Sequence, residues 1–222
     1  MTPSQATADR LYRFAPGVRS RTRLIPNAVD PGARPRHRAE IDEVRRQCRL
    51  GRRHVLTVGG DRPHKNLARL TDAWTTLDPN LRGDAVLALV GSPPPRIDHP
   101  TVRVLGAVPD EDLQALYQGA TMVVSPSLEE GFGLPVAQAL ACGTPVTCSD
   151  LQVLRELAGE AALFFDPNDP VSLRNALARM LSDGGLRRDL RRRGPDRVAR
   201  FAPPLIAAEL LSTLQAAATA GT

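Results

Sequence analysis

The stretch HVLTVGGDRPHKNLARL, residues 54–70, carries the pattern that decides the fold. Its first five residues form an apolar run, which is typical of a strand buried on both faces. The glycine pair Gly59–Gly60 ends that run. Leu67 and Leu70 then begin a helical periodicity that continues to Ala73. The stretch therefore predicts a buried strand, a glycine-softened turn and a helix over residues 66–76.

The same alternation of strand and helix continues along the chain. Further apolar runs predict strands at 85–92, 101–108, 121–127, 145–149 and 162–165. Helical patterns occupy 41–50, 110–120, 135–142 and most of 170–218. Val- and Leu-rich strands that alternate with helices indicate an α/β fold whose parallel sheet is covered on both faces. Ligands of such open sheets bind beyond the carboxyl ends of the strands. The loops 59–66, 91–100, 106–110, 125–135 and 149–151 are therefore the candidate sites.

Lys65 lies in the first of these loops and is the only lysine of the chain. Lys and Arg together number 29, so the other 28 are arginines. A lysine retained among so many arginines favours a site that needs a compact ammonium rather than a planar guanidinium. Chance placement at a solvated helix start is the alternative.

The loop 59–66 has the composition of an anion site. Gly59 and Gly60 allow a ligand to approach the backbone closely. Arg62, His64 and Lys65 bring positive charge to a helix N-terminus, which itself favours an anion. These features predict a phosphate or diphosphate site, although an ordinary strand-to-helix turn remains the alternative. The spacing matches neither GxxxxGK[ST] nor GxGxxG.

A second loop, within SPSLEEGFGLPVAQALACGTPV at 125–146, suits a sugar. Gly131 and Gly133 make its backbone flexible, so that its amides can line a polar ligand. Glu130 can accept hydrogen bonds from two hydroxyls. Gln138 follows eight residues later, placed in the first turn of the next helix. The alternative is that both side chains are exposed surface residues without a ligand.

Several motifs in order resemble one enzyme family. EGFGLPVAQALACGTPV, VGGDRPHKNL, AVPDEDLQALY and AGEAALFFDPND resemble the nucleotide-sugar-binding half of retaining GT-B glycosyltransferases of the group-one type (family four). The resemblance runs from about residue 4 to about residue 201. It implies a Rossmann-like, doubly wound parallel sheet, the C-terminal half of a GT-B fold, which binds a nucleoside diphosphate (NDP) sugar as substrate and needs no cofactor.

The resemblance also assigns roles to individual residues. Lys65, with help from Arg62, would contact the diphosphate, and Glu130 would contact hydroxyls of the donor sugar. Position 138 would hold the ribose diol. The stretch 106–109, which includes Gly106 and Val108, would border the nucleobase. Backbone amides for sugar and phosphate would come from Gly131, Phe132, Gly133 and Leu134.

The chain departs from the family pattern in two ways. Gln138 stands where the family has the second Glu of its E-x7-E signature, so we expect roughly tenfold weaker donor binding. Residues 1–32 resemble only the end of the N-terminal domain and the interdomain linker. The expected division is therefore 1–32 as that remnant, 33–201 as the nucleotide-sugar-binding domain and 202–222 as a C-terminal helix. Apolar side chains of that helix would lie partly uncovered: Leu205, Ile206, Leu210, Leu211 and Leu214.

Composition and charge argue against several other classes of protein, namely membrane-spanning, secreted, metal-binding and nucleic-acid-binding proteins. The chain is 42% hydrophobic and has no apolar run of the roughly 18 residues that a membrane span needs. It has no signal-peptide pattern, and its three cysteines (Cys48, Cys142, Cys148) fit no metal spacing, so we expect a cytoplasmic protein without a metal. The net charge of +5 permits anionic ligands. With 4% aromatics, a nucleic-acid partner is not expected, and membrane association has no support in the sequence.

Two further patterns receive structural interpretations. Asp110, Glu111 and Asp112 match an acidic D-x-D pattern but fit the start of a helix better, because acidic residues favour that end. His37, His54 and His99 have no partner pattern and are interpreted as structural or surface residues.

The leading hypothesis is the donor domain of a hexosyltransferase, with a slight preference for mannosyl-type donors from the HKN sequence. A non-catalytic or degenerate nucleotide-sugar-binding module is the alternative, as is one half of a split enzyme whose acceptor domain is a separate chain. The base, the sugar and the acceptor stay open.

Overall fold

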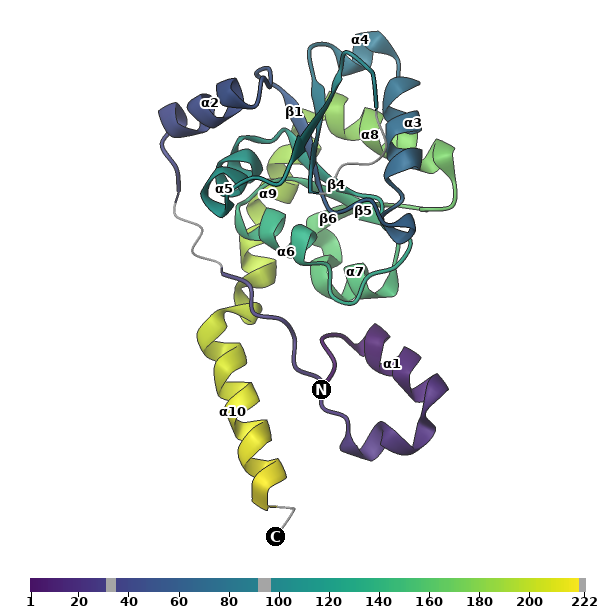
Figure 1. Cartoon of the computed structure of the whole chain (residues 1–222), viewed down its shortest axis with the longest axis vertical. Coiled ribbons are helices and arrows are strands. Elements are labelled where there is room, and N and C mark those ends of the chain that lie inside the picture. The colour runs from purple at the N-terminus through teal and green to yellow at the C-terminus, as the bar shows by residue number, and fades with distance from the viewer. Residues whose placement is uncertain (31–34, 92–96, 220–222) are drawn as a thin grey trace.

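The protein, described here from a computed structural model that covers residues 1–30, 35–91 and 97–219, is built around a six-stranded parallel sheet (Figure 1). The strand order is β3-β2-β1-β4-β5-β6. The strands are β1 (His54–Val58), β2 (Val86–Val90), β3 (Val102–Gly106), β4 (Met122–Ser125), β5 (Val146–Ser149) and β6 (Ala162–Phe165). The predicted α/β fold with a doubly wound parallel sheet is confirmed.

The direction of winding reverses at β1. From β1 the sheet grows outward through β2 to β3, and the chain then returns to place β4 on the other side of β1. Leu56 of β1 accordingly pairs with Ala88 of β2 and with Val123 of β4. A crevice forms at such a reversal because the connections on its two sides leave in opposite directions. The loops after β1 and β4 flank that crevice.

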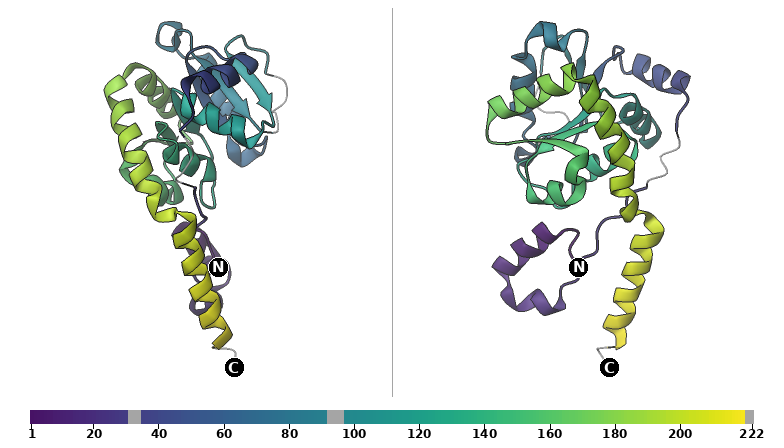
Figure 2. Two further views of the ribbon diagram at one scale, coloured as in Figure 1. Left: turned by 90° about the vertical axis from the view of Figure 1, so that its left-hand side faces the viewer. Right: turned by 180° about the vertical axis from the view of Figure 1, so that it is seen from behind.

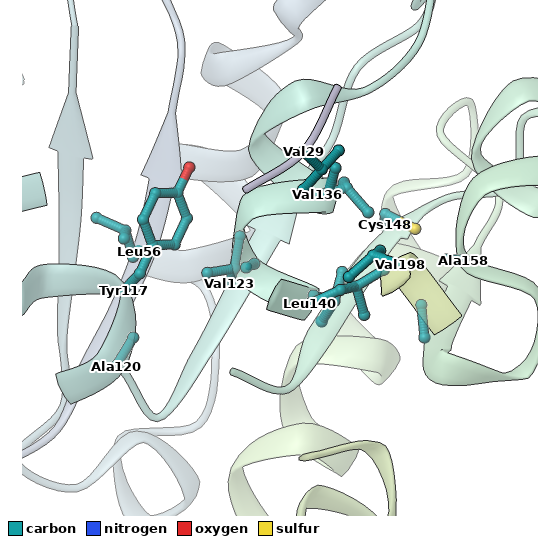
Figure 3. Close-up of a cluster of buried hydrophobic side chains, with 14 of the residues drawn as sticks. Val29, Leu56, Tyr117, Ala120, Val123, Val136, Leu140, Cys148, Ala158 and Val198 are labelled. Atoms are coloured by element: carbon teal, nitrogen blue, oxygen red, sulfur yellow. The ribbon is translucent and has the colours of Figure 1, made fainter. Parts of the chain in front are cut away.

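One face of the sheet is covered by α2 (Arg38–Gln47), α5 (Asp110–Gly119), α6 (Leu134–Ala141) and α7 (Gln152–Ala158). Figure 3 shows part of the core beneath them, in which Leu56 and Val123 of the sheet lie among helix residues such as Tyr117 and Leu140. These side chains are almost completely buried. Burial of this apolar surface is the main term that holds the helices on the sheet.

The opposite face is covered by α3 (Leu67–Thr75) and α8 (Pro170–Ser182), with the short α4 (Pro79–Arg82) beside α8. Trp74 is fully buried there, and its indole N–H donates to the Thr101 carbonyl at 3.2 Å. Helix α9 (Gly184–Val198) supplies Leu190 to this core and Val198 to the other one. Residues 92–96, which are half of the expected loop 91–100 and include the proline run 93–95, lie outside the described residues.

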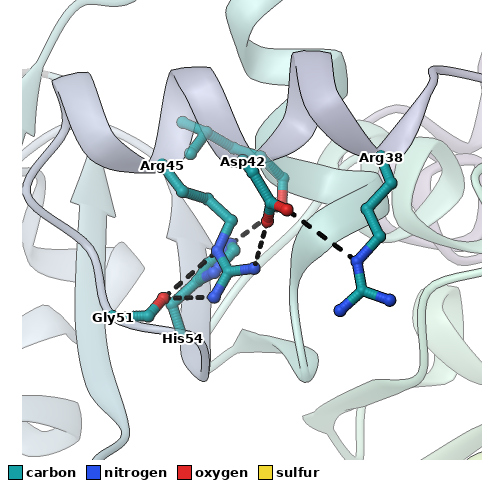
Figure 4. A network of polar contacts seen from close by, with 6 residues as sticks. Arg38, Asp42, Arg45, Gly51 and His54 are labelled. Carbon is teal, nitrogen blue, oxygen red and sulfur yellow. Dashed lines mark hydrogen bonds and ion pairs between the residues drawn. The ribbon is translucent and has the colours of Figure 1, made fainter.

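A polar contact network attaches α2 to the start of β1 (Figure 4). Arg45 pairs with Asp42 at 3.1 Å and donates to the Gly51 carbonyl. His54 is fully buried, and its Nε2 lies 2.9 Å from the Leu116 carbonyl, so Nε2 carries the proton. Desolvation lowers the pKa of His54 to about 4, which keeps the ring neutral. The structural interpretation of this histidine agrees with the geometry.

The N-terminal segment contains more structure than the sequence indicated. Where the sequence suggested a polar stretch and a linker, the chain forms α1 (Gln5–Phe14) and a 3-10 turn, η1 (Pro16–Arg21). Ser4 caps α1 by accepting the Thr7 N–H. A bridge between Thr2 and Leu24 closes this part into a loop, visible in purple in Figure 2. The sequence contains little sign of this helix because Ala8 is its only buried residue.

The last helix, α10 (Pro203–Thr219), projects away from the sheet (Figures 1 and 2). Ile206 is buried, whereas Leu205 and Leu211 are each 57% exposed and Leu214 is 51% exposed. The expectation of partly uncovered apolar side chains is confirmed for Leu205, Leu211 and Leu214 and is wrong for Ile206, which packs into the core. The stretch 184–219, which comprises α9, the 3-10 turn η4 (Ala199–Phe201) and α10, is also long and apolar enough to cross a membrane by length and composition. This differs from the expectation that no such stretch exists, although a single helix of this kind is weak evidence for a span.

Candidate functional site

The loops that follow β1 and β4 meet through one ion pair. Lys65 Nζ lies 2.6 Å from Glu130 Oε1, although the two residues are 65 positions apart in the sequence. Their side chains are 18% and 9% exposed, so the pair is largely withdrawn from water. The structure therefore brings together Lys65 and Glu130, the two residues that the resemblance assigned to the diphosphate and to the donor sugar.

Two glycines, Gly59 and Gly91, allow the close backbone packing beneath the loop 59–66. The Gly59 N–H donates to the Val90 carbonyl at 2.9 Å. Gly91 has φ +119°, and a Cβ there would collide with the Gly59 backbone, so only glycine fits. The aliphatic stem of Lys65 then lies over Gly59, where an added Cβ would be 3.5 Å from Lys65 Cδ.

Asn66 connects the loop 59–66 to the loops that follow β4 and β6 by hydrogen bonds. It adopts the left-handed conformation, with φ +55°, between the 3-10 turn η2 (Pro63–Lys65) and α3. Its side-chain amide donates to the Pro126 carbonyl at 3.1 Å and to the Pro167 carbonyl at 3.3 Å. The Leu128 N–H also donates to the His64 carbonyl at 2.7 Å. These bonds hold Lys65 in position before any ligand arrives.

Glu130 is held by more than Lys65. The buried hydroxyl of Ser127 donates to the same atom, Glu130 Oε1, at 2.8 Å. No described residue bonds Oε2 of that carboxylate. One oxygen therefore fixes the side chain, while the other remains able to accept a hydroxyl.

Residues 131–133, called here the glycine loop, follow Glu130 and have backbone N–H groups without a hydrogen-bond acceptor in the ranges that the structure covers. Gly133 has φ +94°, and a Cβ there would lie 2.6 Å from Leu154 Cδ2, so this position requires glycine. The backbone N–H groups of Gly131, Phe132 and Gly133 have no acceptor among the residues that the structure describes. Leu134 then begins α6, and the N–H groups of Leu134 and Val136 also have no acceptor among the described residues, whereas Pro135 has no N–H. Together they form an N-terminal set of donors suited to an anion.

A hollow of about 280 Å³ lies beside the ion pair. Its walls come from the two loops and from α1, where Arg10 contacts Glu129 at 3.4 Å. The lining residues are Thr7, Arg10, His64, Glu129, Glu130 and Gly131. Two carboxylates, a guanidinium, an imidazole and the Thr7 hydroxyl in one open hollow suit a ligand that carries several hydroxyl groups.

Other predicted site residues lie around this centre rather than within it. The Arg62 side chain is exposed and bonds no described residue. Gly106 has φ +67° with open space where a Cβ would be, so the backbone there is accessible. Val108 lines a separate hollow next to Cys48 and Arg103. The Phe132 side chain is buried against Phe201, which leaves only its backbone for a ligand.

Gln138 lies in a different hollow from Glu130. It is in the second turn of α6, not the first, because α6 begins at Leu134. With Leu134, it lines a space of about 210 Å³ between α5 and α6. Cys142 lines the same space, and burial raises the pKa of its thiol to about 11, so it is not a nucleophile at neutral pH.

The acidic side chains do not form a metal centre in the described part of the chain. No group of three or more His, Cys, Asp or Glu side chains that could hold a metal ion occurs there. Asp110, Glu111 and Asp112 occupy the first turn of α5, where the helix dipole favours them. Their position agrees with the structural interpretation, although none makes a capping hydrogen bond.

Sequence reasoning missed four residues that build the site: Ser127, Asn66, Ser4 and Thr7. Ser127 had a usable signal, because a hydroxyl three residues before a loop carboxylate can reach it. Asn66 had one too, since asparagine tolerates the left-handed conformation before a helix. Ser4 and Thr7 had none, because they bond Gly131 from more than 120 positions away.

Curated relatives were found for most of the chain. The O-antigen chain mannosyltransferase B of Escherichia coli is 35% identical over an alignment 179 residues long, which covers 75% of this chain and 47% of that protein. The D-inositol 3-phosphate glycosyltransferase of Salinispora tropica is 32% identical over an alignment 207 residues long, which covers 82% of this chain and 43% of that protein. The chain thus spans about half the length of the curated relatives it matches.

Solved structures share the fold. The sucrose-phosphate synthase of Thermosynechococcus elongatus superposes with a TM-score of 0.79 at 28% identity, covering 97% of this chain and 57% of that one. Anabaena HepE in complex with UDP-glucose gives a TM-score of 0.86 at 20% identity, covering 97% and 63%. The sheet is therefore the Rossmann-like sheet of GT-B glycosyltransferase structures. The family model for glycosyl transferases group 1 matches residues 40–197, and this chain belongs to that family.

Proposed function

We propose that this chain is the donor domain of a glycosyltransferase and binds an NDP-sugar from which a hexosyl group is transferred with retention of configuration. The contact between Lys65 Nζ and Glu130 Oε1, at 2.6 Å, carries this proposal. It joins a phosphate-binding cation and a hydroxyl-binding carboxylate at the strand crossover where α/β sheets bind ligands.

The diphosphate would bind between Lys65 and the start of α6. The ammonium supplies a point charge, and the free N–H groups of Gly131, Phe132 and Gly133 supply fixed dipoles. When the glycosidic C–O bond breaks, its electron pair stays on the leaving diphosphate. Donors already placed around that oxygen stabilise the developing charge without reorganisation. Arg62 adds positive potential from the loop edge, and the proposal needs neither a metal ion nor a cofactor.

The sugar would lie in the hollow beside Glu130. The Oε2 atom accepts one of its hydroxyl groups, while Ser127 and Lys65 hold Oε1. The acceptor hydroxyl forms its new bond to the anomeric carbon on the face that the diphosphate leaves. Its proton passes to the departing phosphate oxygen, so that charge is conserved. This step is the retaining part of the proposal.

The nucleoside would extend from the diphosphate toward α5 and α6. Gly106 offers accessible backbone for the base, and Gln138 offers an amide for the ribose. A neutral amide makes a weaker hydrogen bond than a carboxylate, so donor affinity is expected to be modest. The HKN sequence and the relation to O-antigen mannosyltransferases favour a mannosyl donor.

The acceptor would be bound outside the donor-binding residues described above. The matched relatives are about twice as long as the part that this chain covers. One alternative for completing the active site is a separate acceptor-domain chain, which would form a split enzyme with this one. The exposed leucines of α10 offer an apolar surface for such a partner. A non-catalytic nucleotide-sugar-binding module is the second candidate, and exposed Gln138 in place of a carboxylate favours it.

A thermal-shift panel tests the proposal. UDP, GDP, ADP and their glucose or mannose conjugates are added at millimolar concentration to the wild type, to Lys65→Ala and to the control Arg38→Ala, whose side chain is 93% exposed on α2. Binding to the folded state raises the melting temperature by mass action. A shift in the wild type and in Arg38→Ala that is lost in Lys65→Ala supports the site. No shift with any nucleotide contradicts it, and turnover by the chain alone rejects the binding-only alternative.

A further inference from the structure

Two hydroxyl groups of the N-terminal segment meet at one carbonyl of the glycine loop. Ser4 Oγ lies 2.8 Å from the Gly131 carbonyl oxygen, and Thr7 Oγ1 lies 3.0 Å from it. The two hydroxyl oxygens are themselves 2.9 Å apart, and the Thr7 N–H donates to Ser4 Oγ at 3.1 Å. We name this arrangement of Ser4, Thr7 and Gly131 the hydroxyl clasp.

The clasp determines which way the next amide points. The peptide between Gly131 and Phe132 is trans, since no cis peptide bond occurs among the described residues. In a trans peptide the C=O and the N–H point in opposite directions. With the Gly131 carbonyl drawn toward α1, the Phe132 N–H must point away from α1. That N–H is one of the free donors of the proposed diphosphate site.

Gly131 would otherwise have little to hold it. A Cβ at this position would meet nothing within 4 Å, so packing does not restrict the residue. The glycine backbone can rotate at small energetic cost. The next residue is fixed differently, because the Phe132 ring packs edge-on against Phe201 with centroids 5.4 Å apart. The clasp and this ring contact together leave the intervening peptide one orientation.

We propose that Ser4 and Thr7 are positioning residues for the donor diphosphate, acting through the Gly131 peptide and not by touching the ligand. This inference rests on the proposed function. It adds that α1, which lies outside the residues matched by the family model, belongs to the donor site. An N–H group that is already oriented before the ligand binds increases affinity, because binding then does not have to order that part of the backbone.

The test compares nucleoside diphosphates with monophosphates. Dissociation constants of UDP, UMP, GDP and GMP are measured by calorimetry for the full chain, and the advantage of the diphosphate over the monophosphate is calculated for the base that binds better. Thr7→Val retains the shape of the side chain and should reduce that advantage about threefold. The double variant Ser4→Ala/Thr7→Val should reduce it about tenfold, with monophosphate affinity unchanged. Thr7→Ser should restore the wild-type value.

Controls separate positioning from general damage. Thr213→Val makes the same exchange on α10 and should leave all four constants unchanged. In 15N-labelled protein, the Phe132 amide resonance should shift on adding the diphosphate, and that shift should shrink in Thr7→Val. An unchanged diphosphate advantage in the double variant overturns the inference while leaving the proposed function intact. So does an equal loss of monophosphate affinity. A wild type that binds neither nucleotide class overturns both.

Discussion

Removing the Lys65 ammonium should destabilise the free protein by an amount set by Glu130. The carboxylate is only 9% exposed and would retain a single partner, the Ser127 hydroxyl at 2.8 Å. Breaking a fully buried ion pair costs about 3–5 kcal/mol, whereas an exposed pair contributes about 0–1 kcal/mol. At 18% and 9% exposure the pair lies nearer the buried case. We therefore expect Lys65→Met to lower the free energy of unfolding by about 2 kcal/mol.

Neutralising the partner should recover most of that loss. In Lys65→Met/Glu130→Gln no charge remains uncompensated, so the coupling energy of the cycle should be about 1–3 kcal/mol. For a chain of this size, 2 kcal/mol corresponds to a melting temperature lower by about 4–8 °C. Urea unfolding of the wild type, both single variants and the double variant at pH 7 measures the cycle.

The chain provides a matched control for this cycle. Arg10 and Glu129 lie 3.4 Å apart beside the same hollow, but their side chains are 53% and 60% exposed. A cycle with Arg10→Met and Glu129→Gln should give a coupling energy below about 0.5 kcal/mol. If the Lys65–Glu130 coupling is as small as this control, the two residues do not form a desolvated pair, and the geometry on which the proposed donor site depends is refuted.

Three further predictions follow from burial and backbone geometry. Gly91→Ala should lower the free energy of unfolding by more than about 3 kcal/mol, because its φ is +119° and a Cβ would collide with backbone, whereas Gly17→Ala in open space should be nearly neutral in the same urea experiment. Burial lowers the folded-state pKa of His54 from 6.5 to about 4, so the neutral ring contributes about 3 kcal/mol to the free energy of unfolding above pH 6.5. That contribution is lost as the pH falls toward 4, because the unfolded chain then binds a proton that the folded chain does not. In His54→Gln this part of the dependence of the free energy of unfolding on pH should be missing, and an unchanged pH dependence would contradict the prediction. Burial also raises the pKa of the Cys148 thiol, so a thiol reagent should modify Cys48 in the native protein and Cys148 only on unfolding; comparable native rates would show that the core opens more readily than its packing implies.

The amino-acid sequence by itself determined the elements and the loops that bear the site. Apolar runs, helical periodicity and glycine pairs are local features, and each reports the conformation of its own segment. They were sufficient to predict six strands, the loops after β1 and β4, and the two charged residues Lys65 and Glu130. The uncovered leucines of α10 were expected from the family resemblance, which implies that this helix packs against an N-terminal domain.

Only the tertiary structure decided which residues share a space. Lys65 meets Glu130 because β4 lies beside β1 across the crossover, and strand order is a property of the whole sheet. The same packing placed Gln138 in a separate hollow and brought Ser4 and Thr7 onto Gly131. Contacts between residues far apart in sequence depend on how the layers assemble, which no local periodicity encodes.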